Sequence, residues 1–139
     1  MKRFLPSPQL FLFFVFSFIP VQAAMECPVK FSVFQQATEE YFAISKEFDE
    51  IAPKYLEGTT KAELIDFIKT GYASPEFRRL HQGYCLGLED KISSAVKVRK
   101  IAEQMMYLCK DDLRDIVNHM KKAESLREFL QTHGCVSSS

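Results

Sequence analysis

Four cysteines and three histidines are the residues of this 139-residue chain best suited to metal or redox chemistry. They are Cys27, Cys85, Cys109, Cys135, His81, His119 and His133. No two cysteines form the C-x2-C pair typical of zinc sites, and only His81 and Cys85 stand one helical turn apart. Such a pair can be two metal ligands or an activated thiol, but beside a disulfide the histidine is an ordinary polar neighbour. We therefore predict no metal site and no cofactor.

The other candidate reactive residues do not form a catalytic motif. Asp115 and His119 are one helical turn apart, a spacing that also occurs in ordinary solvent-facing pairs. His133 lies near a predicted helix end, where a charged imidazole interacts favourably with the helix dipole. The sequence contains no G-x-S-x-G nucleophile motif. We predict that the protein is not an enzyme.

The N-terminus has the layout of a secretory signal peptide over residues 1–23. Lys2 and Arg3 precede an apolar run from Leu10 to Ile19, and Ala23 ends a segment suited to signal-peptidase cleavage. The apolar run is about half the ~20 residues that a membrane-spanning helix needs. We therefore predict a secreted, extracellular protein without stable membrane insertion.

The four cysteines are best explained as two disulfides, because an exported chain passes through an oxidising compartment. Cys109 and Cys135 flank the junction at residues 121–124, so an antiparallel helix pair turning there would place them at the same height. This favours pairing Cys27 with Cys85 and Cys109 with Cys135. Pairing Cys27 with Cys135 and Cys85 with Cys109 stays open as an alternative.

Helical periodicity begins early in the predicted mature chain. Apolar residues recur every three or four positions over residues 29–51, and Pro53 predicts that this helix ends there. Thr60 and Glu63 form the capping-box pattern that begins a short helix over residues 60–70.

The second half of the chain is also helical in pattern. Ser74-Pro75 marks the start of a helix, and Ser93-Ser94 is the expected break before a long apolar stripe. The pattern over residues 95–120 fits either one helix or two. Ser125 and Glu128 form a second capping-box pattern before the last helix.

The apolar face of each predicted helix must pack against another helix, because the sequence has no alternating strand pattern that could supply a sheet. We predict an all-α, four- or five-helix bundle-like domain over residues 24–139, cross-linked by two disulfides. Gly83 and Gly87, one turn apart, either permit close approach of another helix or mark a bend, and the continuous apolar stripe favours close approach. Loss of Lys2 and Arg3 from the 18 basic residues leaves 16 against 18 acidic ones, so the mature chain has no overall attraction to nucleic acid.

A small secreted helical domain without catalytic motifs is expected to act by binding a protein or a small ligand. We predict a protein-interaction module whose partner is an extracellular protein. The alternative is an extracellular carrier of a small apolar ligand, such as a fatty acid, in a helical cavity. Four aromatic and methionine residues are the candidate lining of that cavity, although ordinary core packing explains them as well. They are Phe34, Tyr84, Met105 and Met106.

Overall fold

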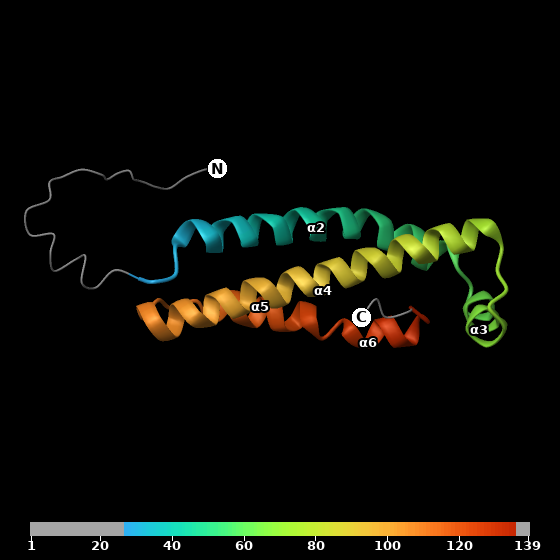
Figure 1. The fold of residues 1–139 in the computed structure, drawn as a ribbon. Coiled ribbons are helices and arrows are strands. Elements are labelled where there is room, and N and C mark those ends of the chain that lie inside the picture. The colour runs from blue at the N-terminus through green and yellow to red at the C-terminus, as the bar shows by residue number, and fades with distance from the viewer. Residues whose placement is uncertain (1–26, 136–139) are drawn as a thin grey trace, which may run out of the picture.

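The computed structural model describes residues 27–135 of the chain (Figure 1). This part contains four helices of ten residues or more and one short helix, and no strand. They are α2 (Phe31–Gly58), α3 (Lys61–Thr70), α4 (Pro75–Cys109), α5 (Arg114–Glu124) and α6 (Arg127–Thr132). The predicted all-α, disulfide-linked, bundle-like fold is therefore confirmed, while the predicted signal peptide lies outside the described residues. Within residues 27–135, no helix has both the length and the apolar character needed to cross a membrane.

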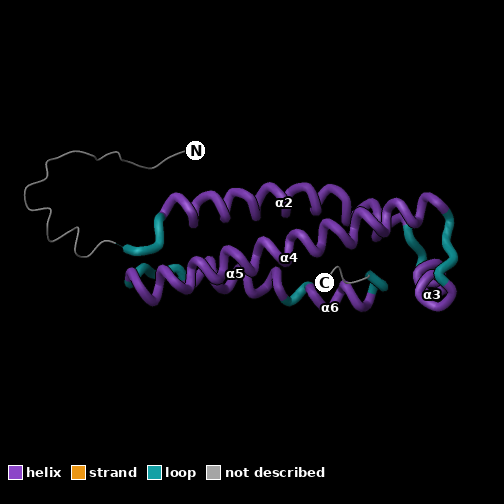
Figure 2. Tube along the Cα trace, in the orientation of Figure 1, coloured by secondary structure: helices purple, strands orange, loops and turns teal. Residues whose placement is uncertain are grey.

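The long helix α4 is the centre of the arrangement. It contacts α2 on one side and α5 and α6 on the other. Figure 1 shows α2 and the α5–α6 segment running along opposite sides of α4, with α3 seen end-on at one end of the molecule. Figure 2 shows that only short loops join the helices. The molecule is therefore elongated along α4, which spans about 50 Å at 1.5 Å per residue.

Several helix boundaries follow directly from local sequence signals. The Thr60 hydroxyl accepts from the Glu63 amide, and the Glu63 carboxylate accepts from the Thr60 amide, so the predicted capping box is formed. Gly71 ends α3 in the left-handed conformation, at φ 75°. The Ser74 hydroxyl caps α4 by accepting from the Phe77 amide.

Two predicted breaks are wrong. Pro53 lies inside α2, which continues to Gly58. An interior proline costs about 3 kcal/mol of helix stability, but extending the helix buries Tyr55 completely. Ser93-Ser94 does not interrupt α4 either. Ser94 is buried and its hydroxyl donates to the Lys91 carbonyl, which satisfies the polar group within the helix.

The chain reverses direction after α4, at residues 110–113. Lys110 adopts a left-handed conformation, with φ 62°, and α5 begins at Arg114. Residues 95–120 therefore form parts of two helices. The capping box predicted at Ser125 is absent, because its hydroxyl donates to the Lys122 carbonyl and no side chain caps α6.

Two cores line the length of α4. The first joins α2, α4 and α5, and its members include Phe34, Ala37, Tyr41, Ala95, Val98, Ala102, Met105, Val117, Met120 and Ala123. The second lies toward the α3 end, and its members are Phe48, Tyr55, Phe77, Tyr84, Cys85, Leu88 and Ile92. The apolar spacing predicted for residues 29–51 runs through Phe34, Ala37, Tyr41, Ile44, Phe48 and Ile51. Four of these residues are buried, whereas Ile44 and Ile51 are half-buried.

Of the two glycines of α4, only Gly87 shows the predicted close approach of another helix. A Cβ atom placed on Gly87 would lie 3.0 Å from Cδ1 of Phe48, which is tighter than ordinary packing. A Cβ atom on Gly83 would lie 3.6 Å from Cγ2 of Ile51, an ordinary van der Waals distance. The missing side chain at Gly87 therefore makes room for the Phe48 ring of α2.

The disulfide pairing differs from both pairings considered above. Cys27 is bonded to Cys109, and Cys85 is bonded to Cys135. The preferred pairing assumed a reversal at residues 121–124, but α5 and α6 run in the same direction and the reversal lies near Lys110. Lys110 is equidistant in sequence from Cys85 and Cys135, so these two cysteines meet across the antiparallel segments.

The continuity of α4 also excludes the alternative pairing. Cys85 and Cys109 both lie in this unbroken helix, about 36 Å apart along its axis. A disulfide requires Cα atoms within about 7 Å. Because α2 runs antiparallel to α4, Cys27 lies beside Cys109 instead, with a Cα–Cα distance of 5.1 Å.

Candidate functional site

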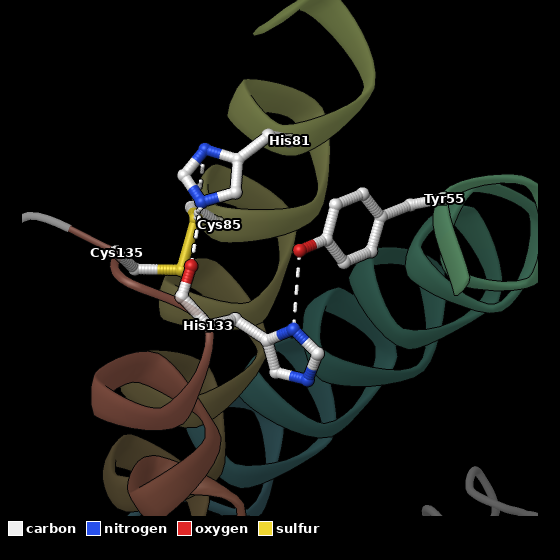
Figure 3. Close-up of a disulfide and its surroundings, with 5 residues drawn as sticks. All are labelled: Tyr55, His81, Cys85, His133 and Cys135. Carbon is white, nitrogen blue, oxygen red and sulfur yellow. Dashed lines mark hydrogen bonds between the residues drawn. A yellow bond between two sulfur atoms is a disulfide. The ribbon is translucent and has the colours of Figure 1, made fainter. Parts of the chain in front are cut away.

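The surroundings of the Cys85–Cys135 disulfide hold the densest group of chemically capable side chains in the described part of the chain (Figure 3). His81 and Cys85 come from successive turns of α4, Tyr55 comes from the end of α2, and His133 and Cys135 come from the segment after α6. We call these five residues the histidine–disulfide cluster. The sequence identified His81 as the neighbour of a disulfide and His133 as a charged residue at a helix end. It carried no signal that His133 would instead be held against Tyr55, with its pKa lowered by burial.

Hydrogen bonds hold the cluster in one arrangement. The His81 Nε2 atom lies 2.7 Å from the backbone oxygen of His133 and 3.5 Å from the Cys85 sulfur. A carbonyl oxygen only accepts, so Nε2 carries the proton and donates. The Tyr55 hydroxyl lies 3.1 Å from Nδ1 of His133. Together with the disulfide, these contacts attach the C-terminal segment to both α2 and α4.

Aromatic rings surround the cluster. The Tyr55 ring stacks on Tyr84 at a centroid distance of 4.5 Å, and the His81 ring stacks on Phe77 at 5.4 Å. His81 is buried, as are both tyrosines. The cluster is thus part of the second core, and its polar groups satisfy one another there.

The electrostatics of the cluster favour uncharged groups. Burial, with a smaller contribution from the neighbouring Tyr84, raises the pKa of Tyr55 to about 12. Burial and the nearby His81 lower the pKa of His133 below its ordinary value of 6.5. A neutral imidazole and a neutral phenol therefore face each other at neutral pH.

Three potential metal ligands meet in the cluster. One ligand atom each from His81, Cys85 and Cys135 lies within 4.8 Å of the other two. Zinc binds cysteine as the thiolate. Both sulfur atoms are bonded to each other here, so neither is a thiolate. In this oxidised form the cluster is a structural cross-link with a hydrogen-bonded histidine.

The other sequence-based candidates lie apart from the cluster. Asp115 and His119 are both exposed, as expected of a solvent-facing pair. The His119 ring lies 6.1 Å from Tyr41, edge to face, and 6.0 Å from Phe42. This contact connects α5 to α2.

The candidate cavity lining is divided between the two cores. Phe34 and Met105 are buried in the first core, and Met106 packs against it. Tyr84 is buried in the second core. These four residues therefore do not surround a common cavity.

A cavity of about 250 Å³ lies elsewhere, where α2, α3 and the C-terminal segment meet. Its lining includes Tyr55, Leu56, Thr59, Lys61, Leu64 and His133. The hydroxyl oxygen of Thr59 is the only side-chain polar atom of residues 27–135 that is buried without a hydrogen-bond partner. No sequence pattern indicated this cavity, because its walls come from three separate segments.

Three large exposed apolar or aromatic side chains lie at the opposite end of the molecule. The Cys27–Cys109 disulfide joins the segment before α2 to the end of α4 there. Phe31 is 60% exposed, Tyr107 is 78% exposed and Leu108 is 49% exposed. We call these three residues the bridge-end surface.

Comparison of the chain with protein-family models, with curated proteins and with solved structures found no match. The two disulfides are consistent with an extracellular or other oxidising compartment.

Proposed function

We propose that this chain is a secreted, non-enzymatic protein-interaction module that binds an extracellular protein through the bridge-end surface. The observation that carries the proposal is the exposure of Phe31, Tyr107 and Leu108 at one end of the molecule. Large apolar side chains grouped at an exposed end are typical of interaction sites. Exposed tyrosines in particular contribute strongly to binding when a partner covers them.

The same end is rigidly constructed. The Cys27–Cys109 disulfide fixes the start of α2 beside the end of α4. Phe31 lies one turn before the buried Phe34, and the centroids of the two rings are 6.1 Å apart. A surface that is already ordered loses little conformational entropy when it binds a partner. This supports recognition by a preformed face.

Secretion is part of the proposal and rests on two features. The first is the basic start and apolar run of residues 1–23. The second is the pairing of all four cysteines into disulfides. A non-enzymatic role is supported by the histidine–disulfide cluster, because its hydrogen-bonding groups contact one another within the core.

Site-specific photocrosslinking tests the proposed surface. A photoreactive phenylalanine analogue is placed at Tyr107 or, as the matched control, at Tyr72. These tyrosines are 78% and 75% exposed and lie near opposite ends of α4. Each variant is then irradiated in fluid from the secretory source of the protein. We expect one saturable crosslinked protein from position 107, suppressed by excess unlabelled protein.

The control distinguishes specific binding at the bridge-end surface from nonspecific binding by exposed tyrosines. Position 72 should give no crosslink to that protein. Equal labelling from both positions, or none that unlabelled protein suppresses, would contradict binding through the bridge-end surface. Tyr107→Ser should abolish capture of the partner while leaving the thermal unfolding midpoint unchanged, because Tyr107 is not part of either core.

A further inference from the structure

We propose that the 250 Å³ cavity between α2, α3 and the C-terminal segment binds a small amphiphile with a hydrocarbon body and a carboxylate head. This site lies at the α3 end of the molecule, away from the bridge-end surface. It is independent of the protein-binding role proposed above. It also differs from the cavity expected around Phe34, Tyr84, Met105 and Met106.

The size of the cavity limits the body of the ligand. An engineered cavity of about 150 Å³ is large enough for benzene, while sites for drug-sized molecules measure about 300–1,000 Å³. A cavity of about 250 Å³ falls between these values. It therefore suits a short alkyl chain or a single substituted ring.

The walls favour an apolar body. Leu56 and Leu64 present aliphatic side chains from α2 and α3, and Tyr55 contributes an aromatic ring. His133 also lines the cavity, and its lowered pKa keeps the imidazole neutral near neutral pH. The body of the ligand thus meets uncharged groups on each of these sides.

The charge of the lining favours an anionic head. Lys61 is its one fixed charge, and no aspartate or glutamate lines the cavity. Lys61 is exposed and forms no salt bridge within the described residues. It is also the first residue of α3, where the helix dipole favours negative charge and where the Glu63 carboxylate already accepts from the Thr60 amide.

Thr59 is a second polar residue beside the cavity, although its hydroxyl oxygen is not exposed to the cavity in this conformation. Its oxygen atom is buried without a hydrogen-bond partner, which is unusual for a polar atom in a folded protein. A hydroxyl can donate to a carboxylate oxygen after rotation about its side-chain bond. A short- to medium-chain carboxylate combines the body and the head that this lining accommodates.

Titration with sodium octanoate, followed by amide chemical shifts of the oxidised protein, tests the proposal. We expect saturable shifts centred on Thr59, Lys61 and Leu64, with a dissociation constant below about 5 mM. Octanol, which has the same chain and no charge, should bind more weakly. Octylamine should bind more weakly still, because it places a cation beside Lys61.

Two matched lysine variants test the head-group contact. Lys61→Gln should weaken octanoate binding about two- to fivefold, the range of an exposed ion pair. Lys69→Gln removes an exposed charge from the other end of α3 and should leave the affinity unchanged. Both variants should bind octanol as the unmodified protein does.

Two results would overturn the proposal. The absence of saturable shifts around the cavity would exclude the ligand site itself. Equal binding of octanol and octanoate, or equal loss in the two lysine variants, would exclude the carboxylate assignment. The crosslinking result at Tyr107 has no bearing on either measurement.

Discussion

The hydroxyl of Tyr55 lies 3.1 Å from Nδ1 of His133, although the two residues are 78 positions apart in the chain. This contact joins the last turns of α2 to the segment that follows α6. Between them, the Cys85–Cys135 disulfide attaches the same segment to α4. The C-terminal segment is therefore tied to both long helices, and its attachment forms one wall of the cavity beside α3.

The Tyr55–His133 contact should contribute measurably to stability. Tyr55→Phe removes the hydroxyl and leaves Nδ1 of His133 without this partner, so we expect a loss of about 0.5–1.5 kcal/mol in unfolding free energy. Tyr84→Phe is the matched control, because Tyr84 is also buried in the stack but forms no hydrogen bond to another described residue. Denaturant unfolding of both variants measures the difference. Equal losses would contradict a specific role for the hydroxyl.

The lowered pKa of His133 predicts a loss of stability in mild acid. Above its ordinary value of 6.5, the imidazole is neutral in both the folded and the unfolded chain, and the stability is fully present. As the pH falls below that value, the unfolded chain takes up the proton first, so the unfolding free energy decreases. The decrease ends below the folded-state pKa. Denaturant unfolding at about pH 7.5 and about pH 5.5 measures it.

His133→Gln separates this effect from that of other titrating groups. The variant retains His81 and His119, so only the contribution of His133 disappears. We expect it to be less stable at neutral pH but to lose less stability on acidification than the unmodified protein. A pH dependence identical to that of the unmodified protein would show that His133 does not couple protonation to folding.

The two glycines of α4 should respond differently to alanine. Gly83→Ala should stabilise the protein by up to about 1 kcal/mol, because the helix gains propensity and the added Cβ has ordinary space. Gly87→Ala should lose this gain or destabilise the protein, because its Cβ meets Phe48 at 3.0 Å. Phe48 is buried, with its ring 5.4 Å from that of Tyr84, so it has little room to move. Thermal unfolding should rank the variants in this order, and the reverse order would contradict the close approach.

Peptide mapping under non-reducing conditions should recover Cys27 joined to Cys109 and Cys85 joined to Cys135. The two bridges close loops with sequence separations of 82 and 50 residues.

Replacing either cysteine pair with alanine should lower the unfolding free energy by about 2–5 kcal/mol. Loss of the Cys85–Cys135 pair should also reduce the acid sensitivity attributed to His133, whereas loss of the other pair should not. A peptide joining Cys27 to Cys85 would contradict the fold.

The helix starts were the most predictable part of this structure. The Thr60–Glu63 capping box and the Ser74-Pro75 start each depend on residues within one turn. The buried face of α2 was also predictable, since apolar spacing alone identifies Phe34, Tyr41 and Phe48. Such signals are local, so they do not depend on which other helices the segment packs against.

The errors came where tertiary contacts outweighed a local preference. Pro53 disfavours a helix, but α2 continues past it and buries Tyr55 against Tyr84. Ser93-Ser94 resembles a break, but the serines remain within α4. Each error placed a turn at the wrong residue. The positions of the turns decide which cysteines lie close enough to form a disulfide.

By itself, the sequence determined an all-α chain with two disulfides, because helical periodicity and an even number of cysteines are properties of the chain. The tertiary structure alone decided that Cys85 pairs with Cys135 and that Tyr55 meets His133. It also decided that residues of α2, α3 and the C-terminal segment line a common cavity. These features depend on where the chain reverses direction and on how far α4 continues, and both are set by the packing of distant residues.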